Sequence, residues 1–203
     1  LQALSEKASE LRALTPAEVV WPGSMMGAAG FDVPFEGLRW VSDLLESYEF
    51  ESDLGVAEPM GIPSRRTVRR EPVGVVAAVV PWNVPQFVAA AKLAPALLTG
   101  CSVILKPSPE SPLDAYLLAD IAREAGLPEG VLSILPADRE ISEYLVGHPG
   151  VDKVSFTGSV AAGKRVMEVA ARNLTRVTLE LGGKSAAIVL PDADLESAVA
   201  GIV

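Results

Sequence analysis

The chain has 203 residues, of which 49% are hydrophobic, so it is long and apolar enough to form a packed domain and is not a disordered segment. Its formal net charge of −9 argues against nucleic acid as a partner, because phosphate binding needs a clustered excess of Lys and Arg. The single cysteine excludes an internal disulfide and fits a cytoplasmic location. One cysteine and one histidine are too few for a zinc site.

Apolar residues at helical spacing mark the first part of the chain, up to about residue 55. The two helical patterns are formed by Leu1, Leu4, Ala8 and Leu11, and by Leu38, Val41, Leu44 and Leu45. Between them, residues 21–34 are rich in Gly and Pro and predict an irregular connection. Helical patterns stand at both ends of the sequence, so we expect a fragment of a longer protein. No run approaches the roughly 20 apolar residues of a membrane span, and no signal peptide is visible.

A basic run at residues 65–70 lies within a segment, residues 56–72, that is interrupted by Pro59, Gly61, Pro63 and Pro72. The run is better explained as an exposed strand whose charges protect a sheet edge than as an anion-binding patch. We therefore divide the chain into a helical N-terminal segment with a basic linker strand, residues 1–70, and a main domain, residues 71–203.

From residue 73 onward, short runs rich in Val and Ile alternate with helical patterns. Strands are predicted at Val73–Val80, Ser102–Lys106, Val131–Leu135, Lys153–Phe156, Arg176–Leu181 and Ala186–Leu190. Helices are predicted near residues 84–98, 112–125, 139–147 and 159–173. Apolar strands that alternate with helices indicate an α/β fold with a parallel sheet covered on both faces. Such sheets bind ligands at the carboxyl ends of their strands, so function should be sought there.

Polar side chains follow the first two of these strands. Asn83 lies in the proline-rich turn after Val80, and its amide could donate a hydrogen bond to an oxyanion or, equally well, cap the next helix. Lys106 ends the second strand, where its ammonium group could reach a ribose or phosphate oxygen. Taken alone, Lys106 is better explained as a solvated lysine, whereas the two interpretations of Asn83 stay open.

Two glycine-containing turns follow later strands. Gly158, Ser159 and Gly163 lie where a strand passes into a helix, whose free N–H groups favour a pyrophosphate; a serine-capped helix after a tight turn is the alternative. Glu180 precedes Gly182 and Gly183 at the end of an apolar strand. Partial desolvation there would raise the pKa of Glu180 toward that of a general base, but an ion pair with a nearby lysine is equally possible.

Four motifs, each at a strand end, resemble those of the aldehyde dehydrogenase superfamily in order and approximate spacing. They are Pro81–Asn83, Leu105–Ser108, Phe156–Ser159 and Glu180–Ser185. The resemblance covers residues 71–203 well and residues 1–70 only by general helical character. It implies a dinucleotide-binding, Rossmann-like parallel sheet with helices on both faces, preceded by a helical segment, in a chain from which the catalytic domain is missing.

The resemblance also implies a role for each motif. Asn83 would donate a hydrogen bond to the thiohemiacetal oxyanion, and Glu180 would be the general base that activates water for thioester hydrolysis. Lys106 would hold the adenosine ribose, and Ser159 would bind the pyrophosphate. The remaining cofactor contacts would come from Pro81, Trp82, Ser108, Gly158, Gly163, Leu181 and Gly182.

The sequence departs from the family pattern at two places. Many members carry a Glu three residues after the strand-end lysine, where it grips the ribose hydroxyls; here Pro109 stands at that position and Glu110 follows it. We therefore expect NAD, with NADP possible. The family nucleophile is a cysteine some tens of residues beyond Glu180, which lies outside this sequence. Cys101, at the opposite end of a predicted strand, is expected to be a buried, inert thiol, and His148 a turn residue.

The resulting prediction is part of an NAD(P)-dependent aldehyde dehydrogenase that acts on a small-molecule aldehyde and forms a homo-oligomer in its full-length parent. We expect the 203 residues alone to be inactive. One alternative is a nucleotide-binding module without oxidation chemistry, which would need neither Asn83 nor Glu180. Another is a reductase of acyl phosphates on a related fold, which the Glu180–Ser185 motif disfavours.

Overall fold

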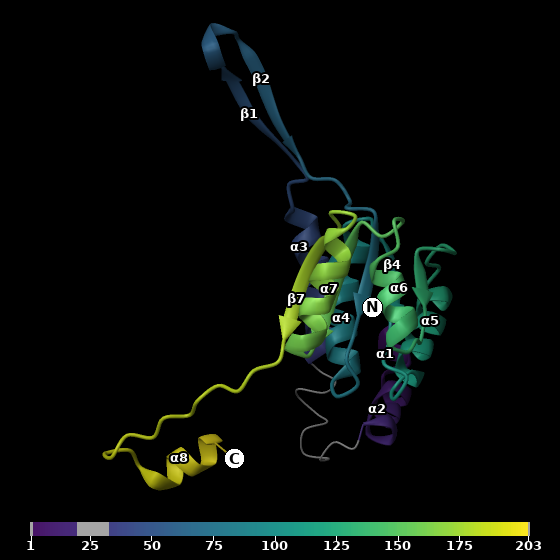
Figure 1. Ribbon diagram of the computed structural model, residues 1–203, viewed down its shortest axis with the longest axis vertical. Helices are drawn as coiled ribbons and strands as arrows, with labels where there is room; N and C mark the ends of the chain where they lie inside the picture. Colours follow the sequence, from purple (N-terminus) through teal and green to yellow (C-terminus); the bar gives the residue numbers. More distant parts are fainter. Residues whose placement is uncertain (1, 20–32, 203) are drawn as a thin grey trace.

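A five-stranded parallel sheet forms the centre of the molecule. The computed structural model describes residues 2–19 and 33–202 (Figure 1). In the sheet the strands lie in the order β5-β4-β3-β6-β7. Their bounds are β3 (Val75–Val79), β4 (Ser102–Lys106), β5 (Leu132–Ile134), β6 (Lys153–Gly158) and β7 (Arg176–Leu181). All four neighbouring pairs are parallel, which confirms the predicted α/β fold and five of the six predicted strands.

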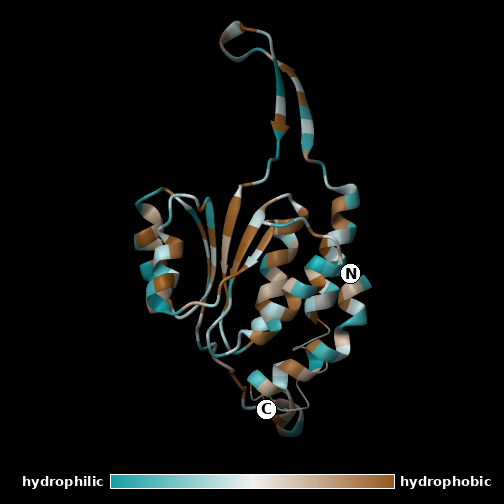
Figure 2. Ribbon diagram, turned by 90° about the vertical axis from the view of Figure 1, so that its right-hand side faces the viewer, coloured by the Kyte–Doolittle hydropathy of each residue, from teal (hydrophilic) through white to brown (hydrophobic). Residues whose placement is uncertain are grey.

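The alternation of side chains along β3 decides which helices cover which face. Val76 and Ala78 point to one face, where they pack with α4 (Pro85–Leu98) and α5 (Leu113–Glu124). Ala77 and Val79 point to the other, where they pack with α6 (Arg139–Val146) and α7 (Val160–Ala171). Figure 2 shows these apolar strands in brown between the helices. Because successive side chains of a strand point to opposite faces, one short strand contributes to two apolar cores at once.

The N-terminal helices form an additional layer outside the helices of one face. Leu11, from α2 (Ala8–Glu18), packs against Leu117 and Ile121 of α5, and the short helix α1 (Gln2–Glu6) adds to the same cluster. The longer helix α3 (Val33–Ser47) lies against α4. The helical prediction is therefore confirmed for these segments. The predicted irregular connection falls largely on residues 20–32, which lie outside the described residues.

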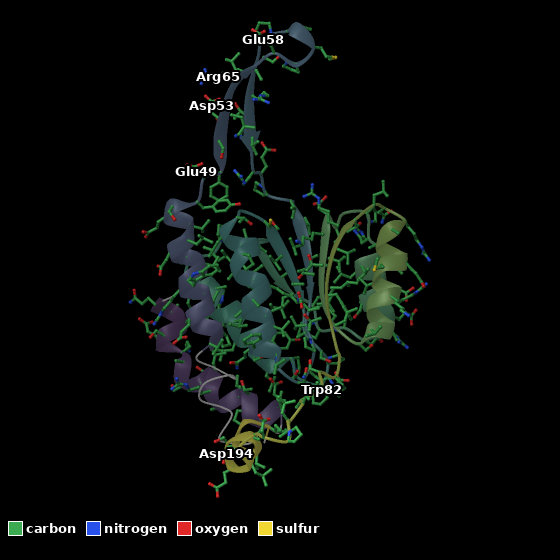
Figure 3. The ribbon with its side chains drawn as sticks, turned by 90° about the vertical axis from the view of Figure 1, so that its left-hand side faces the viewer. Glu49, Asp53, Glu58, Arg65, Trp82 and Asp194 are labelled. Carbon is green, nitrogen blue, oxygen red and sulfur yellow. The ribbon has the colours of Figure 1, made fainter. Side chains whose placement is uncertain are left out.

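A two-stranded hairpin extends away from the body of the molecule (Figure 1). Strand β1 (Glu51–Ala57) pairs antiparallel with β2 (Ser64–Arg69), and a short 3-10 helix, η3 (Pro59–Gly61), closes the turn. The basic run is thus an exposed strand, as predicted. The helical pattern does not continue to residue 55, however, because residues 51–57 pair with β2 instead. An ion pair of 2.7 Å between Arg65 and Asp53 spans the two strands (Figure 3).

The predicted strand at Ala186–Leu190 is wrong. These residues have no regular structure and are exposed, and the chain runs from β7 away from the sheet to α8 (Leu195–Ile202) (Figure 1). Within the described residues, β7 pairs only with β6, so a further apolar run has no neighbouring strand to complete its backbone hydrogen bonds. No helix of the described part of the chain is both long and apolar enough to cross a membrane.

Gly74, immediately before β3, should be intolerant of substitution. Its φ angle is 110°, and a Cβ atom would overlap the carboxylate of Asp152, which accepts a hydrogen bond of 2.8 Å from the Val75 N–H. We expect Gly74→Ala to lower the free energy of unfolding by about 2 kcal/mol, measured by urea denaturation. Gly37→Ala is the matched control, because Gly37 is helical with open space around it and should gain about 0.5 kcal/mol. Equal stability of both variants would contradict this explanation.

Candidate functional site

The four motif-bearing turns lie along one edge of the sheet. In the register, Val79 of β3 lies opposite Lys106 of β4 and Phe156 of β6, and Phe156 lies opposite Leu179 of β7. Because all these strands run in the same direction, the turns that follow them emerge side by side. The sequence-based expectation of a shared carboxyl edge is therefore confirmed.

The turn between β3 and α4 presents Pro81, Trp82 and Asn83. Trp82 is 57% exposed at the end of the body opposite the hairpin (Figure 3), and its carbonyl accepts a hydrogen bond of 3.3 Å from the Ser111 hydroxyl. Asn83 is exposed. Helix α4 begins after an N-cap at Val84 that makes no side-chain capping bond, so Asn83 does not occupy the N-cap position. Asn83 thus precedes the N-cap residue of α4, and its role stays a prediction.

A pocket of about 390 Å³ lies beside this edge, between the ends of the strands and helices α6 and α7. Lys106 contributes to its lining and is only 8% exposed. Burial lowers the pKa of Lys106, and the charge of the nearby Glu110 carboxylate opposes that shift. Ser108, Pro109 and Glu110 line the same pocket, and the Ser108 hydroxyl donates a hydrogen bond to the Glu110 carboxylate. The apolar part of the lining consists of Val79, Ala137, Val146, Phe156, Ala162, Val166 and Val169.

Charged side chains on α6 and α7 border the same pocket. Arg165 of α7 donates a hydrogen bond of 3.1 Å from its Nε atom to the carboxylate of Glu143 on α6, and one of 3.0 Å to Glu168. These bonds raise the pKa of Arg165 and hold the guanidinium in place, and the bond from Arg165 lowers the pKa of Glu143. Arg139 also lines the pocket. The pocket therefore combines apolar walls with a buried ammonium group and fixed surface charges.

The turn between β6 and α7 is shaped by packing. Ser159 is the N-cap of α7, and its hydroxyl accepts a hydrogen bond of 3.2 Å from the Ala162 N–H. A Cβ atom at Gly158 would come within 2.6 Å of the Phe156 ring, and one at Gly163 within 2.5 Å of the Leu181 side chain. Both glycines thus allow close contact within the β6, β7 and α7 layer. A pyrophosphate contact from these residues and from Ser159 stays a prediction.

The end of β7 places Glu180 opposite Thr157 in the sheet register. Glu180 is exposed, so the desolvation expected from the sequence is absent among the described residues. The chain that follows remains attached to the sheet edge, because the Gly182 N–H donates a hydrogen bond of 3.1 Å to the Gly158 carbonyl. Leu181 packs over Gly163, whereas Gly182 has open space around it.

A lysine that the sequence analysis missed lies close to this strand. Lys92 of α4 is 7% exposed, and its ammonium group donates a hydrogen bond of 3.0 Å to the Ser155 hydroxyl on β6. Burial lowers the pKa of Lys92 to about 8, and the negative charge of Glu180 opposes that shift. An electrostatic interaction between Glu180 and a lysine is therefore present. The available signal was the helical spacing of Lys92 with buried residues, namely Pro85, Val88 and Ala89.

The only thiol of the chain lies at the opposite edge of the sheet. Cys101 precedes the first residue of β4 and is 4% exposed, and its N–H donates a hydrogen bond of 2.9 Å to the Ala96 carbonyl. The expectation of a buried cysteine away from the ligand-binding edge is confirmed. His148 is a turn residue, as expected, with its Nδ1 atom accepting a hydrogen bond of 3.0 Å from the Gly150 N–H.

Comparison with known proteins gives a family match over the whole sequence. The model described as "Aldehyde dehydrogenase family" matches residues 1–203. The chain is 53% identical over 162 residues to geranial dehydrogenase of Castellaniella defragrans, a match that covers 80% of this chain and 33% of that protein. It is 52% identical over 133 residues to 4-trimethylaminobutyraldehyde dehydrogenase B of Danio rerio, which covers 66% of this chain and 26% of that protein.

Solved structures give the same result. A Mycobacterium tuberculosis aldehyde dehydrogenase complexed with NAD+ superposes with a TM-score of 0.89 at 40% sequence identity, covering 97% of this chain and 40% of that chain. A lactaldehyde dehydrogenase superposes with a TM-score of 0.88 at 36% identity, covering 99% of this chain and 41% of that chain. The chain thus spans less than half the length of the related proteins that it matches.

The buried ammonium group of Lys92 should make stability depend on alkaline pH. Its pKa is about 8 in the folded chain against an ordinary 10.5, so between these values the unfolded chain binds more protons and the free energy of unfolding rises with pH. We expect a rise of about 2 kcal/mol in urea denaturation that disappears in Lys92→Met. Lys164→Met, at an exposed position on α7, is the control and should keep the rise. An identical pH dependence in the wild type and Lys92→Met would contradict the assignment.

Proposed function

The chain belongs to the aldehyde dehydrogenase family, and on this premise we propose that it forms the dinucleotide-binding part of an enzyme that oxidises an aldehyde to a carboxylic acid with NAD. The observation that carries the proposal is the alignment of four turns on one sheet edge. Asn83 and Ser159 lie in the turns after β3 and β6, Lys106 and Glu180 lie at the ends of β4 and β7, and these four strands are neighbours in the sheet. Fold alone would leave the activity open, because related sheets serve many functions.

The residues present fit a dinucleotide. The apolar walls between α6 and α7 suit the flat adenine ring, and the buried Lys106 ammonium with the Ser108 hydroxyl supplies donors for ribose oxygens. The N-terminus of α7, with Ser159 as its cap, favours the negative charge of a pyrophosphate. Remaining contacts in the proposal come from Pro81, Trp82, Gly158, Gly163, Leu181 and Gly182. NAD, when bound, supplies the acceptor for the hydride of the aldehyde.

In the proposed reaction, Asn83 and Glu180 perform different tasks. The exposed amide of Asn83 donates a hydrogen bond to the oxyanion of a thiohemiacetal, which stabilises charge that develops in the transition state. Glu180 then takes a proton from the water that hydrolyses a thioester. The ammonium group of Lys92, which donates a hydrogen bond to the Ser155 hydroxyl, supplies a positive charge near Glu180.

The thiol that attacks the aldehyde is not supplied by these 203 residues. Cys101 is the only cysteine, it is buried, and it lies at the amino end of β4, whereas Asn83 and Glu180 lie at the carboxyl ends of their strands. Without a nucleophile that forms the covalent adduct, Glu180 has no thioester to hydrolyse. We therefore propose that the 203 residues alone bind dinucleotide but do not oxidise aldehydes.

The related proteins are named for different aldehydes, geranial and 4-trimethylaminobutyraldehyde. A homo-oligomer in the cytoplasm is part of the proposal. Its support is the projecting hairpin, where Val56 is 69% and Met60 is 96% exposed, together with a single cysteine that forms no disulfide. The alternative function, a nucleotide-binding module without oxidation, would leave Asn83 and Glu180 without a task.

Removal of the proposed base tests the oxidation. In an enzyme that joins these residues to the catalytic thiol, Glu180→Gln should lower the steady-state rate of NADH formation by about two to four orders of magnitude, because the amide keeps the shape but accepts no proton. The affinity for NAD should change little. Glu196→Gln, an exposed carboxylate on α8, is the matched control and should be fully active. Unaltered turnover in Glu180→Gln would exclude this role.

Cofactor choice should depend on Glu110. This carboxylate lines the pocket beside Lys106 and would repel the 2′-phosphate of NADP, a task that Pro109 cannot perform. We expect NAD to bind more tightly than NADP, and Glu110→Gln to reduce the discrimination roughly tenfold, since a repulsion of about 1.4 kcal/mol corresponds to that factor. Competitive titration of both dinucleotides measures this, with Glu140→Gln as the control outside the pocket. Tighter binding of NADP by the wild type would show that Lys106 meets the phosphate instead.

A further inference from the structure

Helix α2 ends against the first turn of α5 through an unusual cap. The carboxylate of Glu18, the last residue of α2, accepts hydrogen bonds of 2.7 Å from the Leu113 N–H and 3.2 Å from the Asp114 N–H. These are two of the N–H groups that have no partner within α5 itself. The N-cap of α5 is Pro112, which makes no side-chain capping bond. Glu18 therefore caps α5 from a helix that lies 95 residues earlier in the chain.

A second carboxyl group is buried beside the first. Asp114 is 1% exposed, and its Oδ2 atom has no hydrogen-bond partner among the described residues. From α2, Glu18 faces it with a negative charge, and on its own helix the Ala115 N–H donates to it. Within the described chain, no lysine or arginine is among the groups that act on its titration. Burial, and after it the charge of Glu18, raises the pKa of Asp114 to about 7.

We propose that Glu18 and Asp114 form a pH-sensitive latch, in which a proton on Asp114 keeps α2 docked on α5 and its loss releases α2. One carboxylate is stabilised at a helix N-terminus by the free N–H groups and the helix dipole. A second carboxylate that is buried next to it has no cation to offset the repulsion. The neutral Asp114 removes that repulsion and leaves both oxygens of Glu18 to accept their backbone hydrogen bonds.

The latch has consequences for the candidate site, because the same helices support the turn that bears Trp82 and Asn83. Ser111, 1% exposed and three residues before Asp114, donates its hydroxyl hydrogen bond to the Trp82 carbonyl. Gln86, which follows that turn on α4, donates a hydrogen bond of 3.0 Å to the Leu11 carbonyl of α2. Release of α2 would loosen both supports. Glu18 and Asp114 are thus positioning residues, and their effect does not depend on which reaction the site performs.

The direction of the pH effect follows from the raised pKa. Between the ordinary value of 3.8 and about 7, the folded chain holds a proton on Asp114 that the unfolded chain has lost. The folded state binds more protons there, so the free energy of unfolding falls as pH rises through this window and levels off above about 7. The docking of α2 on α5 is therefore strongest at acidic pH and weaker at and above neutral pH.

Thermal unfolding of the full chain at a series of pH values from about 4.5 to 8.5 tests the latch. Asp114→Asn keeps the shape of the side chain without the charge, so the melting temperature of the wild type relative to this variant should fall by about 5 °C across the window. Asp120→Asn, on the exposed face of the same helix, is the matched control and should follow the wild type. Parallel melting curves of the wild type and Asp114→Asn would overturn the proposal.

Amide hydrogen exchange provides a measurement that holds even if a variant unfolds. In the wild type, the protection factors of the Leu113 and Asp114 amides should fall roughly tenfold between about pH 5 and pH 8. Glu18→Gln, which lacks the charged acceptor, should show low protection at both pH values. Constant protection of these two amides in the wild type would show that Glu18 caps α5 independently of Asp114 and would refute the latch.

Discussion

The structure depends on one constraint, which is that β3 is buried on both faces. Its residues are small, and they divide strictly by position: Val76 and Ala78 serve one helical layer, Ala77 and Val79 the other. Both neighbours of β3 run in its direction, because the helices that connect parallel strands cross over the sheet and cover its two faces. The common direction of β4, β3, β6 and β7 then brings their carboxyl ends to one edge. The grouping of the site residues is a consequence of this packing.

Close approach of helix and strand adds a second level of organisation. Gly163 lets α7 come down onto Leu181, so that the end of β7 and the start of α7 share one packed unit. The hydrogen bond from Gly182 to Gly158 then fixes the backbone that follows Glu180. The position of a carboxylate on the edge strand is therefore controlled by glycines on its neighbours. Glycines, which carry no functional group, thus determine the position of the Glu180 carboxylate.

The sequence predicts those features that depend on local pattern. Runs such as Ser102–Lys106 and Arg176–Leu181 are identified to the residue, because a short run that is rich in apolar or β-branched residues and bounded by turn residues is typical of a strand. The strand predicted at Ala186–Leu190 has the same local pattern but no neighbour to pair with, and strand formation depends on that neighbour. Residues 51–57 show the opposite error: the pattern up to residue 55 predicts a helix, but these residues form a strand because they pair with β2.

Side-chain partners far apart in sequence lie beyond such patterns. The strand-end residues Asn83 and Glu180 can be found because each follows or ends a recognisable strand. The contacts of Lys92 with Ser155, and of Glu18 with Leu113, join residues 63 and 95 positions apart. A lysine on an apolar helix face is a visible signal, but its partner can be known only once the sheet order is known. Asp114 offers no signal at all, since an aspartate in the first turn of a helix is ordinarily exposed.

The N-terminal helix α2 makes both apolar and polar contacts with the helices that cover the sheet. Burial of Leu11 against Leu117 and Ile121 supplies the apolar contact that holds α2 on α5. The polar contacts, from Glu18 and to the Leu11 carbonyl, reach elements that carry or support the turn at Trp82. A non-directional apolar contact sets the strength of docking, while directional hydrogen bonds set its orientation. The orientation of α2 depends on the carboxyl groups of Glu18 and Asp114. The support that α2 gives to the turn at Trp82 therefore changes with pH.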